Sequence, residues 1–102
     1  MTQMEFQEVF SKQMKLCEET LNRKKKEYIG NGSDRLSTFK IAAGLQKSNA
    51  KAALMGMMAK QIVSLYEMSG SRDGIYPVQV WEEKITDSIN YLILLRALVE
   101  EK

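Results

Sequence analysis

The chain has 102 residues, with 15 Lys plus Arg, 13 Asp plus Glu, a formal net charge of +2, no His and a single Cys. This length fits one domain, residues 1–102, and the small net charge gives no reason to expect nucleic acid or a membrane as a partner. The absence of His excludes a Ser-His-Asp triad, a Cys-His dyad and His-ligated metal sites, and one Cys excludes an internal disulfide.

The first predicted element is a helix over about residues 2–27. Thr2 and Glu5 have the spacing of a capping box, in which each side chain satisfies a backbone N–H at the start of a helix. Apolar residues recur at helical spacing through this stretch, at Phe6, Val9, Phe10, Cys17, Leu21 and Tyr28. Because Cys17 lies on this apolar stripe and no His can activate it, we expect it to be a small buried hydrophobic residue.

A turn over residues 29–33 (IGNGS) ends the first helix, because Gly and Asn tolerate positive φ angles. Ser33 or Asp34 can cap the next helix, which is short and runs over about residues 34–45. Its apolar spacing predicts that Leu36, Phe39 and Ala43 are buried, together with either Ile41 or Ala42.

The third predicted helix runs over about residues 48–68 and is apolar on most of its sides. Such a helix is usually central to its domain or is covered by a second subunit, and we interpret this one as the core helix. The fourth helix begins near Pro77, a residue favoured at helix starts, and ends near residue 101. No segment has the two-residue period of a strand. The sequence therefore predicts an all-α bundle of three long helices and one short helix.

Carboxylates on the fourth helix are the best candidates for chemistry, since no His is present. Glu83 and Asp87 are four residues apart and share a face, and Asn90 follows three residues later. Oxygen ligands of this kind suit Mg²⁺. The alternative is an ordinary solvated face, because acidic residues are favoured at the start of a helix. A buried carboxylate needs a partner, and we expect Lys60 to be that partner for Asp87.

Further charged residues extend this interpretation to the first half of the chain. Glu18, on the first helix, can face the acids of the fourth helix across a bundle. Residues 1–51 have a net charge of +4 and residues 52–102 a net charge of −2. The basic run 23–26, with Arg35 and Lys40 after the turn, can bind phosphates that Mg²⁺ bridges to the acids. The alternative is a solvated basic end of a helix.

Four segments resemble one protein family. Residues 81–95 (WEEKITDSINYLILL) resemble the last helix of small MazG-like phage proteins, which belong to the all-α nucleoside triphosphate pyrophosphohydrolases. Residues 24–28 (KKKEY), 34–40 (DRLSTFK) and 56–65 (GMMAKQIVSL) resemble their preceding segments, so the likeness extends over about residues 15–98.

The resemblance implies a nucleotide-binding protein in which acids on neighbouring helices hold Mg²⁺ and a metal-activated water releases pyrophosphate. Asp87 and Glu83 are then the catalytic residues, and the metal ligands are Glu18, Glu83 and Asp87. The substrate-binding set is Lys26, Asp34, Arg35, Lys40, Lys60 and Asn90.

The alternative function is a non-catalytic interaction module that acts on a host or phage protein. Lys84 stands where the family has a glutamate, and the family's Glu-Glu-x-x-Glu motif is absent. Under either function we expect a homodimer or a higher homo-oligomer, because so much apolar surface is better buried between copies.

We expect the protein to be cytoplasmic, in the host if a phage encodes it. The first residues do not have the pattern of a secretory signal, and the lone Cys suits a reducing compartment.

Overall fold

The computed structural model describes residues 1–29 and 34–101, apart from the side chains of residues 26–29. These residues form four helices and no strand: α1 (Gln3–Ile29), α2 (Ser37–Leu45), α3 (Ala50–Ser69) and α4 (Val78–Glu100). The prediction of an all-α bundle with three long helices and one short helix is therefore confirmed. The turn predicted at residues 29–33 falls almost entirely outside the described residues.

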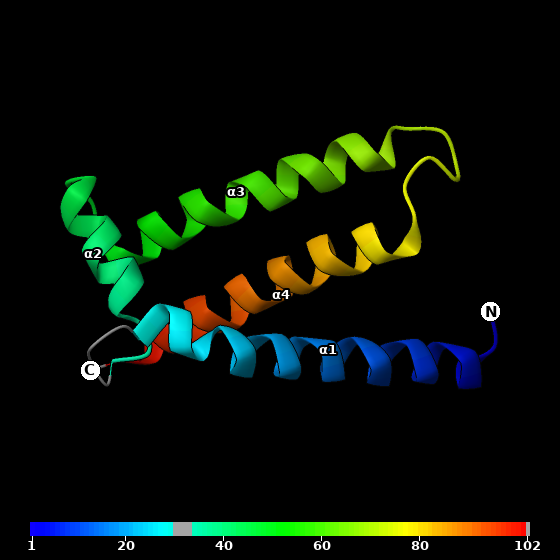
Figure 1. The fold of residues 1–102 in the computed structure, drawn as a ribbon, viewed down its shortest axis with the longest axis horizontal. Coiled ribbons are helices and arrows are strands. Elements are labelled where there is room, and N and C mark those ends of the chain that lie inside the picture. The colour runs from blue at the N-terminus through cyan, green and yellow to red at the C-terminus, as the bar shows by residue number, and fades with distance from the viewer. Residues whose placement is uncertain (30–33, 102) are drawn as a thin grey trace.

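The central helix of the bundle is α4, which packs against both α1 and α3 (Figure 1). Among the described residues, α1 and α3 do not pack side by side, and α2 crosses one end of the layer, where it packs on α3 and α1. The interpretation of the third helix as the core helix is therefore wrong: α3 lies at an edge, and its apolar character extends to a face that no other described helix covers.

Capping side chains fix the starts of two helices. At α1 the Thr2 backbone N–H donates to Glu5 Oε1 at 3.4 Å, and the Glu5 N–H donates to Thr2 Oγ1 at 3.1 Å, so the predicted capping box is confirmed. At α3 the Asn49 side chain accepts a hydrogen bond from the Ala52 N–H at 2.9 Å.

The short helix α2 starts later than predicted because Asp34 forms a turn before it. Asp34 Oδ1 accepts from the Leu36 N–H at 3.0 Å, and the Asp34 carbonyl accepts from the Ser37 N–H. At its other end the Ser48 N–H donates to the Ala43 carbonyl at 2.9 Å, which is the hydrogen bond of a Schellman cap. The left-handed position of this cap is occupied by Lys47, at φ 52°.

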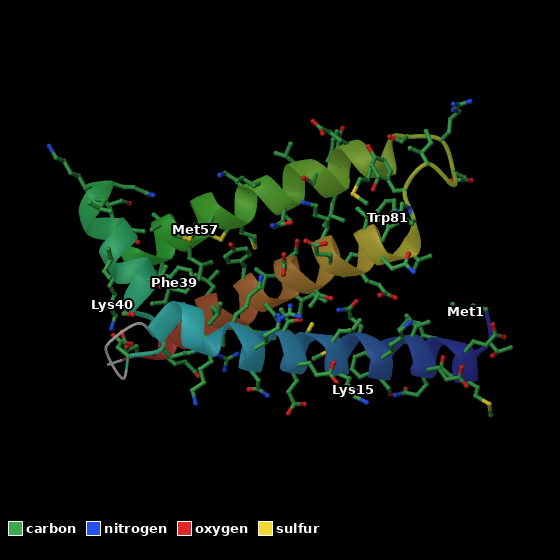
Figure 2. All side chains as sticks on the ribbon, in the orientation of Figure 1. Met1, Lys15, Phe39, Lys40, Met57 and Trp81 are labelled. Carbon is green, nitrogen blue, oxygen red and sulfur yellow. The ribbon has the colours of Figure 1, made fainter. Side chains whose placement is uncertain are left out.

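The hydrophobic core lies where α2 crosses the bundle. Phe39 (Figure 2) is fully buried there, as is Leu54, and the cluster continues into the end of α4 through Leu94 and Leu98. As predicted, Leu36, Phe39 and Ala43 are buried. The choice left open between Ile41 and Ala42 is settled by exposure, since Ile41 is 64% exposed and Ala42 is partly buried.

The rest of the layer is thin and leaves much surface uncovered. The chain has a solvent-accessible surface of 7642 Å², whereas a compact monomer of 11.7 kDa has about 5,900 Å². Its radius of gyration is 15.7 Å, against about 13 Å for a compact domain of this length. The four helices therefore bury less surface than a typical domain of this size.

None of the four helices is long and apolar enough to cross a bilayer, among the residues that the structure describes.

Candidate functional site

The contact between α1 and α4 includes side-chain hydrogen bonds as well as apolar packing. Gln13 on α1 donates through Nε2 to Thr86 Oγ1 on α4 at 2.8 Å, and it also lies 3.4 Å from the sulfur of Cys17. One turn further along, Asn90 Nδ2 donates to the Cys17 carbonyl at 3.3 Å. Cys17 itself is buried, as predicted. These contacts hold α1 and α4 in a defined register, which brings Lys24 of α1 close to Asp87 of α4.

An ion pair between Lys24 and Asp87 lies at the centre of this contact. Lys24 Nζ is 3.3 Å from Asp87 Oδ1, and the two side chains are 30% and 15% exposed. Charges this far from water need partners. The position of Lys24 follows from helical spacing, because it continues the buried stripe that runs through Cys17 and Leu21.

Two hollows share this ion pair in their linings. The larger is an open groove of about 360 Å³, whose charged lining residues are Arg23, Lys24, Glu82, Glu83 and Asp87. The smaller is a cavity of about 20 Å³ that lies deeper between the helices, beside Asn90 and Tyr91. Its volume admits a single water-sized group. The groove and the cavity together are called the α1–α4 groove below.

Asn90 is one of two buried polar residues that line this site, together with Thr86. Its side chain is 6% exposed, and its Oδ1 has no hydrogen-bond partner among the described residues. Burying an amide oxygen without a partner costs about 1–3 kcal/mol. An unpaired acceptor that lines a cavity beside an ion pair calls for an explanation, and a bound water or ligand group would supply one.

The charges in the α1–α4 groove are of both signs and come from opposite walls. Arg23 and Lys24 belong to α1, whereas Glu82, Glu83 and Asp87 belong to α4. Glu82 is engaged by Lys12, with its Oε1 3.1 Å from Lys12 Nζ. This groove therefore complements a ligand that presents both negative and positive groups.

Three of the predicted site residues come together here and two others do not. Glu83, Asp87 and Asn90 line the α1–α4 groove along one face of α4. Lys60 is exposed on α3, so its predicted pairing with Asp87 is wrong: the cation beside Asp87 is Lys24. Glu18 lines a separate groove, beside Phe10 and Met14, and so does not join the acids of α4.

The predicted binding residues of the second helix are engaged in a different structure. Lys40 Nζ lies 2.6 Å from Asp34 Oδ2 and 2.9 Å from Glu101 Oε1, so it ties the start of α2 to the end of α4 (Figure 2). The neighbouring Arg35 donates through Nη2 to the Leu21 carbonyl at 3.4 Å. These three residues connect helices and do not line the α1–α4 groove.

The ion pairs of Lys40 with Asp34 and Glu101 are called the Lys40 clamp below, and their geometry determines the charges there. The hydrogen bond from Lys40, and then the one from the Leu36 N–H, lowers the pKa of the Asp34 carboxyl below its ordinary value. The hydrogen bonds to Asp34 and Glu101 raise the pKa of Lys40. The Asp34 and Lys40 side chains therefore stay charged over a wide pH range. The side chain of Lys26, also predicted to bind substrate, lies outside the described residues.

A magnesium site built from three acids does not fit this arrangement. Within the described part of the chain, no three acidic or Cys side chains gather closely enough to share a metal ion. The predicted ligand set fails because Glu18 is on a different surface of α1, and because Lys24 already neutralises Asp87.

No family model, curated protein or solved structure matches this chain.

Proposed function

We propose that the α1–α4 groove binds a nucleotide, with the Lys24–Asp87 pair at its centre. The observation that supports this proposal is the juxtaposition of that ion pair with the buried, unpartnered Oδ1 of Asn90. A volume of about 360 Å³ is at the small end of the range for ligand sites.

The chemistry of the two walls suits the parts of such a ligand. Arg23 and Lys24 present cations to phosphate oxygens. Glu83 and Asp87 face them and favour a ligand that carries its own positive counter-ion, as nucleoside triphosphates do with Mg²⁺. Asn90 Oδ1 can accept a hydrogen bond from one water or one amino group within the small cavity. Mg²⁺ enters this proposal with the ligand and not as a resident ion.

Hydrolysis of the nucleotide to release pyrophosphate is the reaction that the resemblance to MazG-like proteins suggests. Asp87 and Glu83 are two of the three acids that line the groove. Asp87 is neutralised by Lys24, so it becomes a base for a water only after a ligand displaces that ammonium group. Binding is therefore the first property to test, and pyrophosphate release the second.

The test compares two neighbouring lysines of α1. Lys24 lines the α1–α4 groove, whereas Lys25 is exposed and does not. A panel of canonical and modified nucleotides with Mg²⁺ is expected to raise the melting temperature of the wild type and of the Lys25→Met variant. Lys24→Met is expected to abolish this shift. If no nucleotide shifts the wild type, or if Lys24→Met responds like Lys25→Met, the proposal is wrong.

A second candidate function is a protein-interaction module, which the exposed apolar side chains of α1 favour. Three apolar side chains near the start of α1 are each about half exposed: Phe6, Val9 and Phe10. Exposed apolar clusters of this kind are typical of interaction surfaces. A purified partner that binds the wild type but not a Phe10→Lys variant would support this function, whereas equal binding to both would oppose it.

A further inference from the structure

The outer face of α3 is an uninterrupted uncharged stripe. Seven exposed residues form it, at the spacing of a helix–helix seam: Ala52, Met55, Gly56, Ala59, Ile62, Val63 and Tyr66. The opposite face of the helix packs into the bundle through Ala53, Leu54 and Met58. The three charged residues of α3, Lys51, Lys60 and Glu67, all lie off this stripe. The stripe is called the α3 seam below.

Gly56 is the most informative member of the α3 seam. It lies inside a helix, where glycine costs about 1 kcal/mol relative to alanine. A Cβ atom built at this position meets nothing within 4 Å. Packing within the single chain therefore gives no reason for a glycine here, whereas a second helix packed closely on the seam does.

The surface of the chain is large enough to accommodate such a partner. Its accessible area exceeds that of a compact monomer by about 1,700 Å². A standard interface buries about 800 Å² on each partner, and obligate homodimers bury more. Covering the α3 seam would remove apolar side chains from water, including Tyr66, which is 83% exposed.

The order of residue sizes along the α3 seam points to a second copy as the occupant. Its first half carries the small residues Ala52, Gly56 and Ala59 with one larger residue, Met55, and its second half carries only larger residues, Ile62, Val63 and Tyr66. In an antiparallel pair related by a two-fold axis, the small half of one helix faces the bulky half of the other. The seam is thus complementary to itself, as an isologous interface requires.

We propose that two copies of the chain associate through antiparallel packing of their α3 seams. This closed arrangement places α4 of each copy behind the seam and leaves both α1–α4 grooves open, because α1 lies at the opposite edge of the layer (Figure 1). The proposal does not depend on nucleotide binding.

The experiment compares two helix glycines by light scattering and sedimentation at micromolar concentration. The wild type is expected at twice the 11.7 kDa chain mass. Gly56→Leu favours the helix but blocks close approach, and it is expected to raise the dimer dissociation constant at least ~10-fold, about 1.4 kcal/mol. Gly44→Leu on α2, where a Cβ likewise meets nothing, is the control and is expected to remain dimeric.

Two further variants test whether the interface lies on the α3 seam or on α1. Tyr66→Lys adds a charge to the α3 seam at a highly exposed position, so it is expected to yield a folded monomer by circular dichroism. Phe10→Lys makes a similar change on α1 and is expected to stay dimeric. A monomeric wild type, or a dimer that Phe10→Lys dissociates while Gly56→Leu and Tyr66→Lys leave it intact, would overturn the proposal.

Discussion

Lys24 of α1 and Asp87 of α4 lie 63 positions apart in the chain, yet Lys24 Nζ is 3.3 Å from Asp87 Oδ1. Both side chains are largely withdrawn from water, and Asp87 more so than Lys24. Removing one charge from such a pair costs more than removing both, because the remaining charge keeps its desolvation cost and loses its partner. We therefore expect the pair to contribute more to fixing the register of α1 against α4 than to net stability.

A double-mutant cycle measures this asymmetry. Lys24→Met is expected to lower the free energy of unfolding by about 1–2 kcal/mol, between the values for exposed and fully buried pairs. Asp87→Leu is expected to cost less, because Lys24 is more exposed and can reach water. The double variant is expected to be more stable than Lys24→Met alone. Urea denaturation of the four proteins gives the coupling energy, and strictly additive effects would show that the two charges do not interact.

The clamp at Lys40 predicts a weak dependence of stability on pH. The pKa of Asp34 is lowered in the folded chain, so its contribution is complete above its ordinary value of 3.8 and is lost as the pH falls through the lowered value. The pKa of Lys40 is raised, so its contribution is complete below 10.5 and is lost as the pH rises through the raised value. Between these limits the clamp holds α2 to the end of α4.

Lys40→Met removes both hydrogen bonds of the clamp and is expected to flatten the acid limb of the stability profile. Unfolding midpoints measured from neutral pH down to below 3.8 are the readout. The effect is expected to shrink in high salt, because Asp34 and Lys40 are both exposed and screened. An acid limb of the same steepness in the variant would show that other carboxylates determine it.

The sequence allowed the helices to be predicted because their signals are local. The capping box at Thr2 and Glu5 and the spacing of Leu36, Phe39 and Ala43 depend only on neighbours along the chain. The arrangement of the helices was not predictable in the same way. An apolar α3 suits a central helix as well as an edge helix with a second apolar face, and periodicity does not distinguish them.

The candidate site was predictable in part for the same reason. Helical spacing placed Glu83, Asp87 and Asn90 on one face of α4, where the structure has them. It did not show which helix faces them, so the predicted partner of Asp87, Lys60, differs from the observed one, Lys24. The missed signal is a lysine on the stripe of Cys17 and Leu21, since a charge on a buried stripe implies a partner across the interface.

Lys47 offers a way to stabilise the fold without touching the site. It is the left-handed residue of the α2 cap, at φ 52°, a conformation that costs a residue with a Cβ about 1–2 kcal/mol. Lys47→Gly is expected to raise the free energy of unfolding by about 1 kcal/mol, less the entropy that glycine gains in the unfolded chain. The control Gln46→Gly changes a residue at φ −93°, so it is expected to lower stability. Urea denaturation is the measurement, and a loss of stability in Lys47→Gly would show that the lysine side chain matters more than its backbone angle.

Asn90 provides the sharpest separation of stability from binding. Its Oδ1 is buried without a partner among the described residues, and its Nδ2 donates only to a carbonyl inside α1. Replacing both polar atoms by a hydrocarbon of similar size removes an unsatisfied acceptor, so Asn90→Leu is expected to keep the free energy of unfolding within about 1 kcal/mol of the wild type, or to raise it. If Asn90 is retained for binding, the same variant is expected to lose the nucleotide-dependent rise in melting temperature.

The matched control for Asn90→Leu is Ser88→Ala, because Ser88 is similarly buried but donates within its own helix to the Lys84 carbonyl at 2.8 Å. A full nucleotide response in Asn90→Leu would remove this residue from the binding site, whereas a large loss of stability would show that its amide serves the fold.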